Sequence, residues 1–363
     1  MAVGIAQGQY LAPNDHAIIV GINRYRTGVA APLNGAVNDA KLFREWAIRP
    51  DGGGLNPDNV TLILSPDNGP FVPSRDEIET EIRQFYERGF ETGQPVGRRL
   101  YLFMAGHGIA PPDGNDCSLI TANSFASPYW VVQGGLTADR IRKQPFFEEV
   151  VLFMACCRDV NGSAPFLSGL PEAGQPLQNS KYLHGMAVKW AKRAIEKELP
   201  NPFDRAQLLW QSVFSHALIK GLMSAIDDNG EVTSLSLKNF VRKQVQALLP
   251  PDDNRPPDFA LDDTIPPIVF REAARTAAAS SPGAQESARH AARGLTPVEI
   301  NAGAATDIEV LDGASLNKLD PPMEKTATGT VKVYLKPGLY VFRAPGQQLV
   351  PVRVLGEATS VTI

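Results

Sequence analysis

The sequence has few cysteines, no long apolar stretch and no strong excess of charge. Its 363 residues include only three cysteines, two of them adjacent, so no disulfide framework is expected and a reducing, cytoplasmic compartment fits best. No apolar run approaches the roughly 20 residues that span a bilayer, and residues 1–11 lack the basic-then-apolar pattern of a signal peptide. A net charge of −4 gives no reason to expect nucleic acid or a membrane surface as a partner.

What remains is the composition of a globular protein with more than one domain. Apolar residues make up 43% and charged residues 20% of a chain long enough to build a large core. From about residue 271 to 294, Ala, Ser, Gly and Arg dominate and large apolar residues are absent, which is typical of a linker. We therefore predict a first domain over 14–271, a linker over 272–295 and a small domain over 296–363.

Alternating strand and helix patterns in the first domain indicate an α/β fold. Helices are expected at 35–48, after Ser74 (which forms a capping box with Glu77), up to about Gly221, and after a cap at Ser236. Six strands are expected, at 17–22, 60–64, 99–104, 150–154, 182–190 and 267–270. This order predicts a mostly parallel sheet with helices on both faces. The short strands after residue 296 predict a small β-sandwich.

Two of these strands end in residues that can do chemistry. One runs into Ala105-Gly106-His107-Gly108, and the other runs into Ala155-Cys156-Cys157-Arg158. Parallel sheets carry their functional groups at the carboxyl ends of their strands. An imidazole and a thiol brought together there would form a nucleophilic site, because the imidazole can take the thiol proton. We therefore interpret His107 and Cys157 as a catalytic pair rather than as isolated structural residues.

Several motifs in order resemble the caspase and metacaspase clan of cysteine peptidases (peptidase family C14), and most closely its bacterial members. They are residues 16–22 leading into Gly35-Ala36-Val37-Asn38-Asp39-Ala40, the two strand ends just described, Phe214-Ser215-His216-Ala217-Leu218, and Gly230-Glu231-Val232-Thr233. The separation of the histidine and the cysteine, about 50 residues, is itself a known caspase signature. The resemblance implies a caspase-hemoglobinase-like fold for the first domain, with a central sheet of about six strands.

The resemblance also implies a mechanism and assigns residues to it. Cys157 is identified as the nucleophile, because it stands just before an arginine as in the family pattern, whereas Cys156 would point to the opposite face. Cys117 is interpreted as a bystander. His107 would accept the thiol proton and then protonate the leaving amine. The backbone N–H groups of Gly108 and Cys157 would stabilise the negative oxygen of the tetrahedral intermediate.

Substrate specificity is expected to involve Asp39 and Ala155. Metacaspases resemble this chain at Asp39, where the carboxylate helps to form an acidic pocket for Arg or Lys at the P1 position of the substrate. They usually carry a second aspartate two residues before the nucleophile, and this chain has Ala155 there. We expect a preference for Arg or Lys, with a small or neutral P1 residue as the alternative. On general grounds Asp39 could instead cap a helix or form an ion pair.

No metal cluster is predicted. The histidines and cysteines do not stand at zinc-ligand spacing, and Asp113, Asn115 and Asp116 are interpreted as a solvated loop rather than a calcium site. No cofactor is assigned, but calcium stays open, because some metacaspases require it.

The function predicted from the sequence is that of a cysteine endopeptidase acting on proteins or peptides in a bacterial signalling, cell-death or defence pathway. Basic residues between 159 and 205 suggest that the chain cleaves itself there, as family members do after the nucleophile strand. An activating protein could bind through the C-terminal domain. The alternative is a catalytically inactive caspase-like scaffold that recruits partners.

Overall fold

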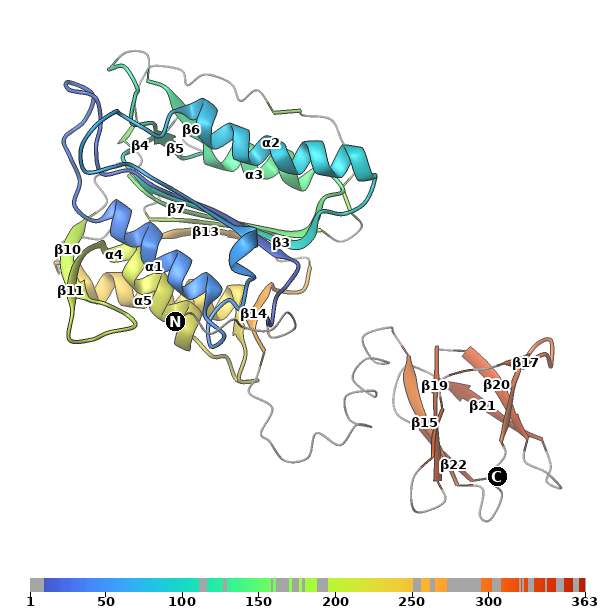
Figure 1. Ribbon diagram of the computed structural model, residues 1–363. Coiled ribbons are helices and arrows are strands. Elements are labelled where there is room, and N and C mark those ends of the chain that lie inside the picture. Colours follow the sequence, from blue (N-terminus) through green and yellow to red (C-terminus); the bar gives the residue numbers. More distant parts are fainter. Residues whose placement is uncertain are drawn as a thin grey trace, which may run out of the picture. The chain divides into compact units, whose positions relative to one another are not determined.

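The buried apolar runs of the sequence pair side by side in one central sheet (Figure 1). The strand order is β13-β9-β7-β3-β1-β2. Five strands run parallel, and β13 joins the edge antiparallel to β9. The bounds are β1 Asp15–Gly21, β2 Val60–Leu64, β3 Gly97–Gly106, β7 Phe147–Cys156, β9 Lys181–Met186 and β13 Asp258–Leu261. The mostly parallel sheet of six strands is thus confirmed.

The computed structural model describes residues 10–110, 116–126, 129–157, 159–160, 170–171, 176–177, 180–187, 195–250, 256–261, 265–272, 295–301, 308–319, 321, 323–325, 330–336, 338–343, 349–354 and 359–362. The chain divides into two compact units, Met1–Ala274 and Arg275–Ile363. Most of the predicted linker lies outside the described residues, and so does the end of the strand predicted at 182–190. The domain boundaries therefore stay a prediction.

One predicted strand does not belong to the central sheet. The sequence predicts that residues 267–270 close it, but β13 does so, and β14 (Val269–Arg271) pairs instead with β12 (Val232–Thr233). The apolar run still has a core to enter, because the Phe270 ring lies 6.4 Å from the rings of Tyr101 and Phe153. Phe270 belongs to one of the two apolar cores that flank the sheet, so this segment is buried by packing although it is not a strand of the sheet.

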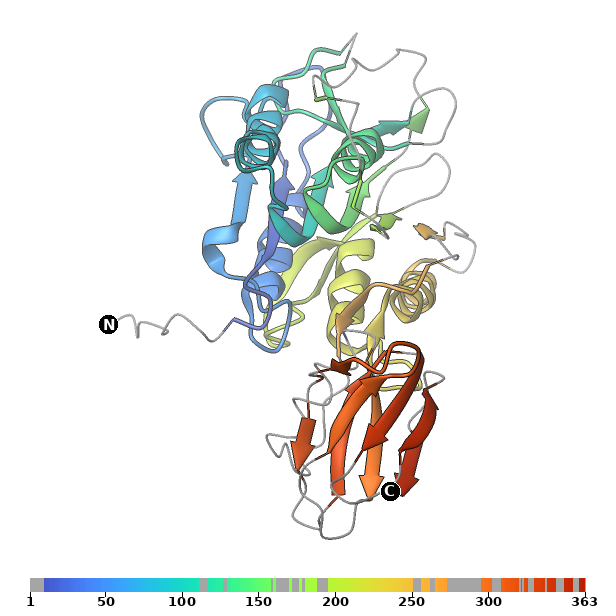
Figure 2. The ribbon, with the colours of Figure 1, turned by 90° about the vertical axis from the view of Figure 1, so that its right-hand side faces the viewer.

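Helices cover both faces of the sheet (Figures 1 and 2). One face packs against α1 (Ala36–Ile48), α4 (Val213–Ser224) and α5 (Ser234–Leu248). The other face packs against α2 (Arg75–Thr92) and α3 (Gly134–Arg142). Because side chains alternate along each strand, Phe103 and Phe153 enter the first core while Leu102 and Leu152 enter the second. No helix within the described part of the chain is both long and apolar enough to cross a bilayer.

The helix caps agree with the sequence at one position and differ at another. The Ser74 hydroxyl accepts the Glu77 N–H at 3.2 Å, and the Glu77 carboxylate accepts the Ser74 N–H at 2.6 Å, so the predicted capping box is confirmed. The cap predicted at Ser236 is wrong, since Thr233 caps α5 and Ser236 is the third helical residue. Each hydroxyl accepts the backbone N–H of the other residue, so both side chains take part in the cap and the sequence alone does not show which residue precedes the helix.

Smaller sheets lie outside the central one in the first unit. A four-stranded sheet of order β6-β5-β4-β8 begins directly after His107. Its strands are β4 Gly108–Ala110, β5 Ser118–Ile120, β6 Val131–Gln133 and β8 Asp159–Val160. A separate antiparallel pair, β10 (Glu196–Pro200) and β11 (Leu208–Ser212), leads into α4. The short 3-10 helix η1 (Pro57–Asn59) precedes β2.

The second unit contains two four-stranded sheets around one apolar core. The sheet orders are β18-β19-β15-β22 and β17-β16-β20-β21. The strands are β15 Thr296–Asn301, β16 Glu309–Asp312, β17 Lys318–Leu319, β18 Met323–Lys325, β19 Thr330–Leu335, β20 Gly338–Arg343, β21 Val350–Val354 and β22 Thr359–Thr362. Val298 and Val333 of the first sheet and Val310 and Phe342 of the second share this core. The small all-β C-terminal domain is thus confirmed.

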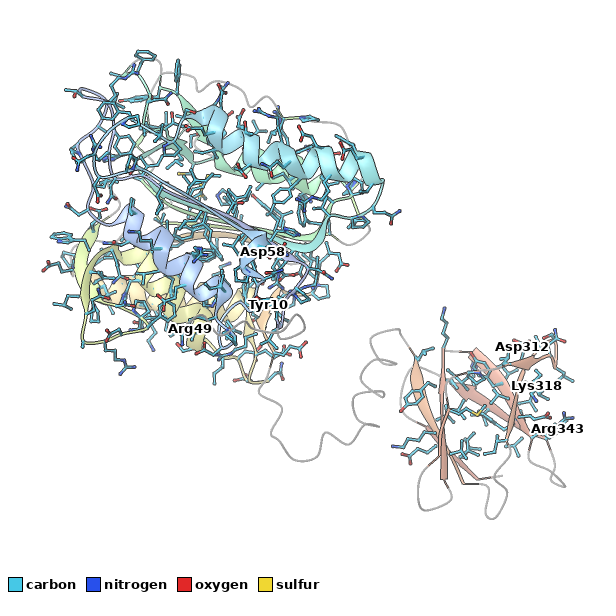
Figure 3. All side chains as sticks on the ribbon, in the orientation of Figure 1. Tyr10, Arg49, Asp58, Asp312, Lys318 and Arg343 are labelled. Carbon is cyan, nitrogen blue, oxygen red and sulfur yellow. The ribbon has the colours of Figure 1, made fainter. Side chains whose placement is uncertain are left out.

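Charged residues occupy the exposed side of the second sheet (Figure 3). On neighbouring strands, Arg343 donates to the Glu309 carboxylate at 2.7 Å and Lys318 donates to it at 3.0 Å. Exposed ion pairs of this kind contribute little to stability because water screens them, so this unit depends mainly on its apolar core.

Candidate active site

Strand register brings the histidine and the cysteine together. β3 and β7 are neighbouring parallel strands in which Gly106 pairs with Cys156. The next residue on each strand is therefore His107 on one and Cys157 on the other. Adjacent strands lie about 4.8 Å apart, so both residues leave the carboxyl edge of the sheet side by side.

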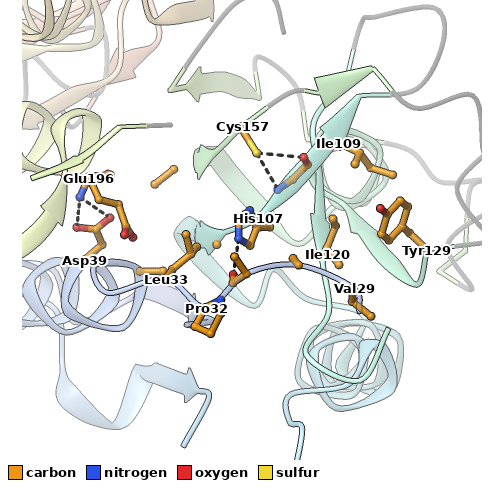
Figure 4. A pocket seen from close by; sticks show the side chains of 17 residues that line it. Val29, Pro32, Leu33, Asp39, His107, Ile109, Ile120, Tyr129, Cys157 and Glu196 are labelled. Atoms are coloured by element: carbon orange, nitrogen blue, oxygen red, sulfur yellow. Dashed lines mark hydrogen bonds between the residues drawn. The ribbon is translucent and has the colours of Figure 1, made fainter. Parts of the chain in front are cut away.

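Both residues line one cavity of about 550 Å³ (Figure 4). Its wall comes from the loop before α1, the first turns of α1, the ends of β3 and β7, and the β10–β11 pair. The lining residues that carry ionisable groups are Asp39, His107, Tyr129, Cys157 and Glu196. Asp39 and Ala155, both named from the sequence, lie in the same wall, so the structure gathers the whole predicted set.

His107 is held at three points. Its Nε2 lies 2.8 Å from the carbonyl oxygen of Ala31, its backbone N–H donates to the Tyr25 hydroxyl at 2.7 Å, and its ring meets the Tyr25 ring edge-on at 5.0 Å. A carbonyl oxygen can only accept, so Nε2 carries the proton. Nδ1 is then the ring nitrogen able to take a proton from a thiol.

Cys157 is engaged with the backbone of Gly108. The Gly108 N–H donates to Sγ at 3.4 Å, and the thiol donates to the Gly108 carbonyl oxygen at 3.2 Å. A Cβ at position 108 would stand 2.5 Å from the Cys157 carbonyl oxygen, so this close approach requires glycine. The Gly108 N–H thus already faces the atom that would attack, which is where a donor to the tetrahedral oxygen belongs.

The other two cysteines are buried in the core that packs against α2 and α3. Cys156 donates to the Met104 carbonyl oxygen at 3.4 Å, and Cys117 donates to that of Cys157 at 3.5 Å. Burial raises the pKa of the Cys156 thiol well above its ordinary value, and the neighbouring Cys117 raises it further. Cys156 is therefore on the opposite side of the strand from the cavity and is held in its unreactive thiol form.

Asp39 is buried in the first turn of α1 and reaches across to α4. Both of its carboxylate oxygens accept the Ser212 N–H, at 3.1 and 3.2 Å, and Ser212 caps α4. Burial raises the pKa of Asp39 to about 7, although hydrogen bonds from Ser212 and Ser215 oppose the rise. The carboxyl thus joins two helices at the cavity wall and does not cap its own helix.

Glu196 is a cavity residue that sequence reasoning missed. It stands at the start of β10, where its carboxylate oxygens accept the N–H groups of Asn34 at 3.0 Å and Gly35 at 2.9 Å. These donors precede α1, whose N-terminus favours a negative charge. Nothing in the sequence around Glu196 marks it, because only the tertiary fold brings β10 against α1.

The described residues contain no group of three or more His, Cys, Asp or Glu side chains placed to hold a metal ion. Asp116 accepts the N–H groups of Cys117, Gly135 and Leu136. Its carboxylate thus accepts hydrogen bonds from the first turn of α3. Asp113 and Asn115 lie outside the described residues.

Comparison with known proteins relates this chain to a protein family, to a bacterial protein and to a solved structure. The caspase domain family profile matches residues 14–256. A protein from a Desulfuromonadales bacterium, named as a probable protease, is 31% identical over 175 residues, which cover 44% of this chain and 21% of that protein. The chain therefore spans about a fifth of the length of this curated relative. The crystal structure of caspase-1 from Spodoptera frugiperda aligns with a TM-score of 0.45 and 15% identity, covering 76% of this chain and 98% of that one.

Proposed function

The chain belongs to the caspase domain family, and from that premise we propose that it is a cysteine endopeptidase using His107 and Cys157. The observation that carries the proposal is the register of β3 and β7, which brings both residues to the lining of one cavity. A thiol and an imidazole in this arrangement suit attack on a peptide carbonyl.

The proposed reaction has two halves. His107 Nδ1 takes the Cys157 proton, Sγ forms a bond to the carbonyl carbon, and the C–N bond breaks as His107 returns the proton to the departing amine. Water then attacks the thioester, giving the carboxylic acid and restoring the thiol. The N–H groups of Gly108 and Cys157 stabilise the oxyanion in both halves. The Ala31 carbonyl keeps the proton on Nε2 throughout.

The proposed P1 residue is Arg or Lys. Asp39 lines the same cavity as the dyad, and a buried carboxylate pairs well with a cationic side chain. Ala155 adds no charge of its own but leaves space beside Cys157. A small or neutral P1 residue would instead be expected if Asp39 acted only to join α1 and α4.

Regulation is proposed to involve cleavage and a partner. Lys189, Lys192 and Arg193 stand in the sequence shortly before β10, so a protease specific for basic residues would find sites in its own chain. The C-terminal β domain is proposed to receive an activating protein. A reducing compartment such as the cytoplasm would keep Cys157 as a thiol.

A single experiment tests the activity and the P1 preference together. Wild type and Cys157→Ala are incubated with a peptide library of varied P1 residues, with and without calcium. Cleavage that disappears in Cys157→Ala, with Arg or Lys at P1, is the expected result. Equal absence of cleavage from both proteins would favour the inactive scaffold. Cleavage that survives the substitution would remove Cys157 from the mechanism.

A further inference from the structure

The described wall of the cavity carries two carboxylates and no Lys or Arg. Asp39 enters from α1 and Glu196 enters from β10, on the same side of the cavity (Figure 4). Glu196 is near enough to raise the pKa of Asp39 electrostatically. The negative charge of this wall is therefore shared between two elements that are 157 positions apart in the sequence, counting from Asp39 to Glu196.

The Glu196 carboxylate is held by two backbone hydrogen bonds and still has acceptor sites for a ligand. Each of its oxygens accepts one backbone N–H, from Asn34 and Gly35. A carboxylate has about four acceptor sites, so each oxygen can still accept a hydrogen bond from a ligand. Gly35 permits the approach, because a Cβ there would stand 2.9 Å from the Glu196 Oε1. The side chain is half-buried at the cavity wall, which weakens its screening by water.

We propose that Glu196 is a specificity-determining residue of the cavity and that, with Asp39, it binds the guanidinium of a P1 arginine. The inference rests on the proposed peptidase function and adds a residue to it. Position 155, where an acidic partner for Asp39 was expected, holds alanine, and Glu196 supplies the second carboxylate from β10 instead. A guanidinium has donors on several edges and can pair with two carboxylates at once.

The pair of carboxylates also explains how a buried acid can bind a cation. In the free protein Asp39 is desolvated, and its pKa is raised to about 7 by burial first and by Glu196 as a minor cause. The groups that face it are the hydroxyls of Ser212 and Ser215 and the Glu196 carboxylate. An entering guanidinium supplies the missing positive charge and favours the ionised form.

Peptides that differ only in arginine or citrulline at P1 provide the test. Citrulline has nearly the same shape as arginine but no charge, so the ratio of the two values of kcat/KM measures recognition of charge. We expect Glu196→Gln to lower this ratio about 10- to 100-fold, the usual effect of losing one charge-assisted hydrogen bond. Glu198→Gln is the matched control, because Glu198 is exposed on the same strand. It should leave the ratio unchanged.

The ratio is internal to each preparation, so partial unfolding of a variant lowers both rates and cancels. Glu196→Asp keeps the charge on a shorter side chain, and its arginine-to-citrulline ratio should lie between those of wild type and Glu196→Gln.

An unchanged ratio in Glu196→Gln, with active wild type, would overturn this inference and leave the proposed function standing. If wild type cleaves neither peptide, the proposed function fails. Binding of both peptides to Cys157→Ala and to Cys157→Ala/Glu196→Gln then decides the inference, and equal discrimination by the two would reject it.

Discussion

The hydroxyl of Tyr25 connects the end of β1 to the candidate catalytic histidine. It accepts the His107 backbone N–H at 2.7 Å and donates to the Ile22 carbonyl oxygen at 3.0 Å. The Tyr25 ring also contacts the imidazole edge-on. A Cβ at Gly106 would stand 2.6 Å from the same hydroxyl, so glycine is needed where the strand passes it. Tyr25 is thus a positioning residue for His107.

Tyr25→Phe should lower kcat about fivefold and leave KM nearly unchanged, because one buried hydrogen bond contributes about 1 kcal/mol. The ring remains, so the imidazole keeps its packing while the His107 backbone loses its acceptor. Steady-state kinetics on a P1-arginine peptide measures the effect. Tyr86→Phe is the control, since the buried Tyr86 hydroxyl has no hydrogen-bond partner among the described residues. A similar loss of kcat in both variants would contradict the positioning role.

The adjacent cysteines should respond in opposite ways to substitution and alkylation. Cys157→Ala is expected to abolish cleavage, whereas Cys156→Ala should retain it and lower the free energy of unfolding by about 1 kcal/mol, the scale of one small buried group. Iodoacetamide should modify Cys157 first. Cys156 is fully buried, and burial raises its pKa, which keeps it in the unreactive thiol form. Peptide mass spectrometry locates the label. Preferential labelling of Cys156 would reverse the assignment.

Self-cleavage should depend on basic residues before β10. Wild type on prolonged incubation is expected to separate into two fragments on a denaturing gel, and Cys157→Ala should stay intact. Replacing Lys189, Lys192 and Arg193 by glutamine should prevent cleavage there, while the same change at Lys238 and Lys243 of α5 should not. Intact wild type that is active on peptides would eliminate self-processing.

The sheet was predictable because its strands are buried on both faces and read as continuous apolar runs. His107 and Cys157 were predictable for the same reason, since each directly follows such a run. The edge strand β13 was not, because only Phe259 in it is fully buried and its sequence resembles a loop. Glu196, Ser212 and Tyr25 escaped prediction because their roles come from contacts between distant elements. Local patterns carry no signal for such contacts.

A buried ionic cluster lies at the opposite, amino-terminal ends of the strands. Arg99 donates to Glu149 at 2.6 Å, to the Tyr101 hydroxyl at 2.7 Å and to the Val269 carbonyl oxygen at 2.7 Å. Because Arg99→Met leaves the Glu149 charge partly uncompensated, it should lower the free energy of unfolding by about 3–5 kcal/mol. Activity per folded molecule should not change, since the cavity is at the other edge of the sheet.

Chemical denaturation of the first unit checks this prediction. Lys143→Met is the control, because Lys143 pairs with Asp139 at 2.8 Å on the surface and such pairs contribute about 0–1 kcal/mol. A loss in Arg99→Met no larger than that of the control would show that the cluster is neutral for stability.

The charge of Asp39 should make substrate preference depend on pH. Its pKa in the folded protein is raised to about 7 from 3.8, so the neutral form dominates below pH 7. A P1 arginine needs the anion, whereas citrulline does not. The arginine-to-citrulline ratio of kcat/KM should therefore rise by up to about tenfold per pH unit below 7 and level off above it, as for one ionisation. Asp39→Asn should flatten this rise.

The same pKa fixes the sign of the effect on stability. The folded protein binds the Asp39 proton more tightly than the unfolded chain, so this group stabilises the fold fully below pH 3.8 and loses that contribution as pH rises through 7. Compared with Asp39→Asn, wild type should become less stable as the pH rises from about 4 to about 7 and should change little above that, as measured by chemical denaturation of the peptide-free proteins. Adding the P1-arginine peptide to the Cys157→Ala background should reduce that loss, because the guanidinium stabilises the ionised carboxylate. A pH-independent difference between the two proteins would show that Asp39 is already ionised in the folded state.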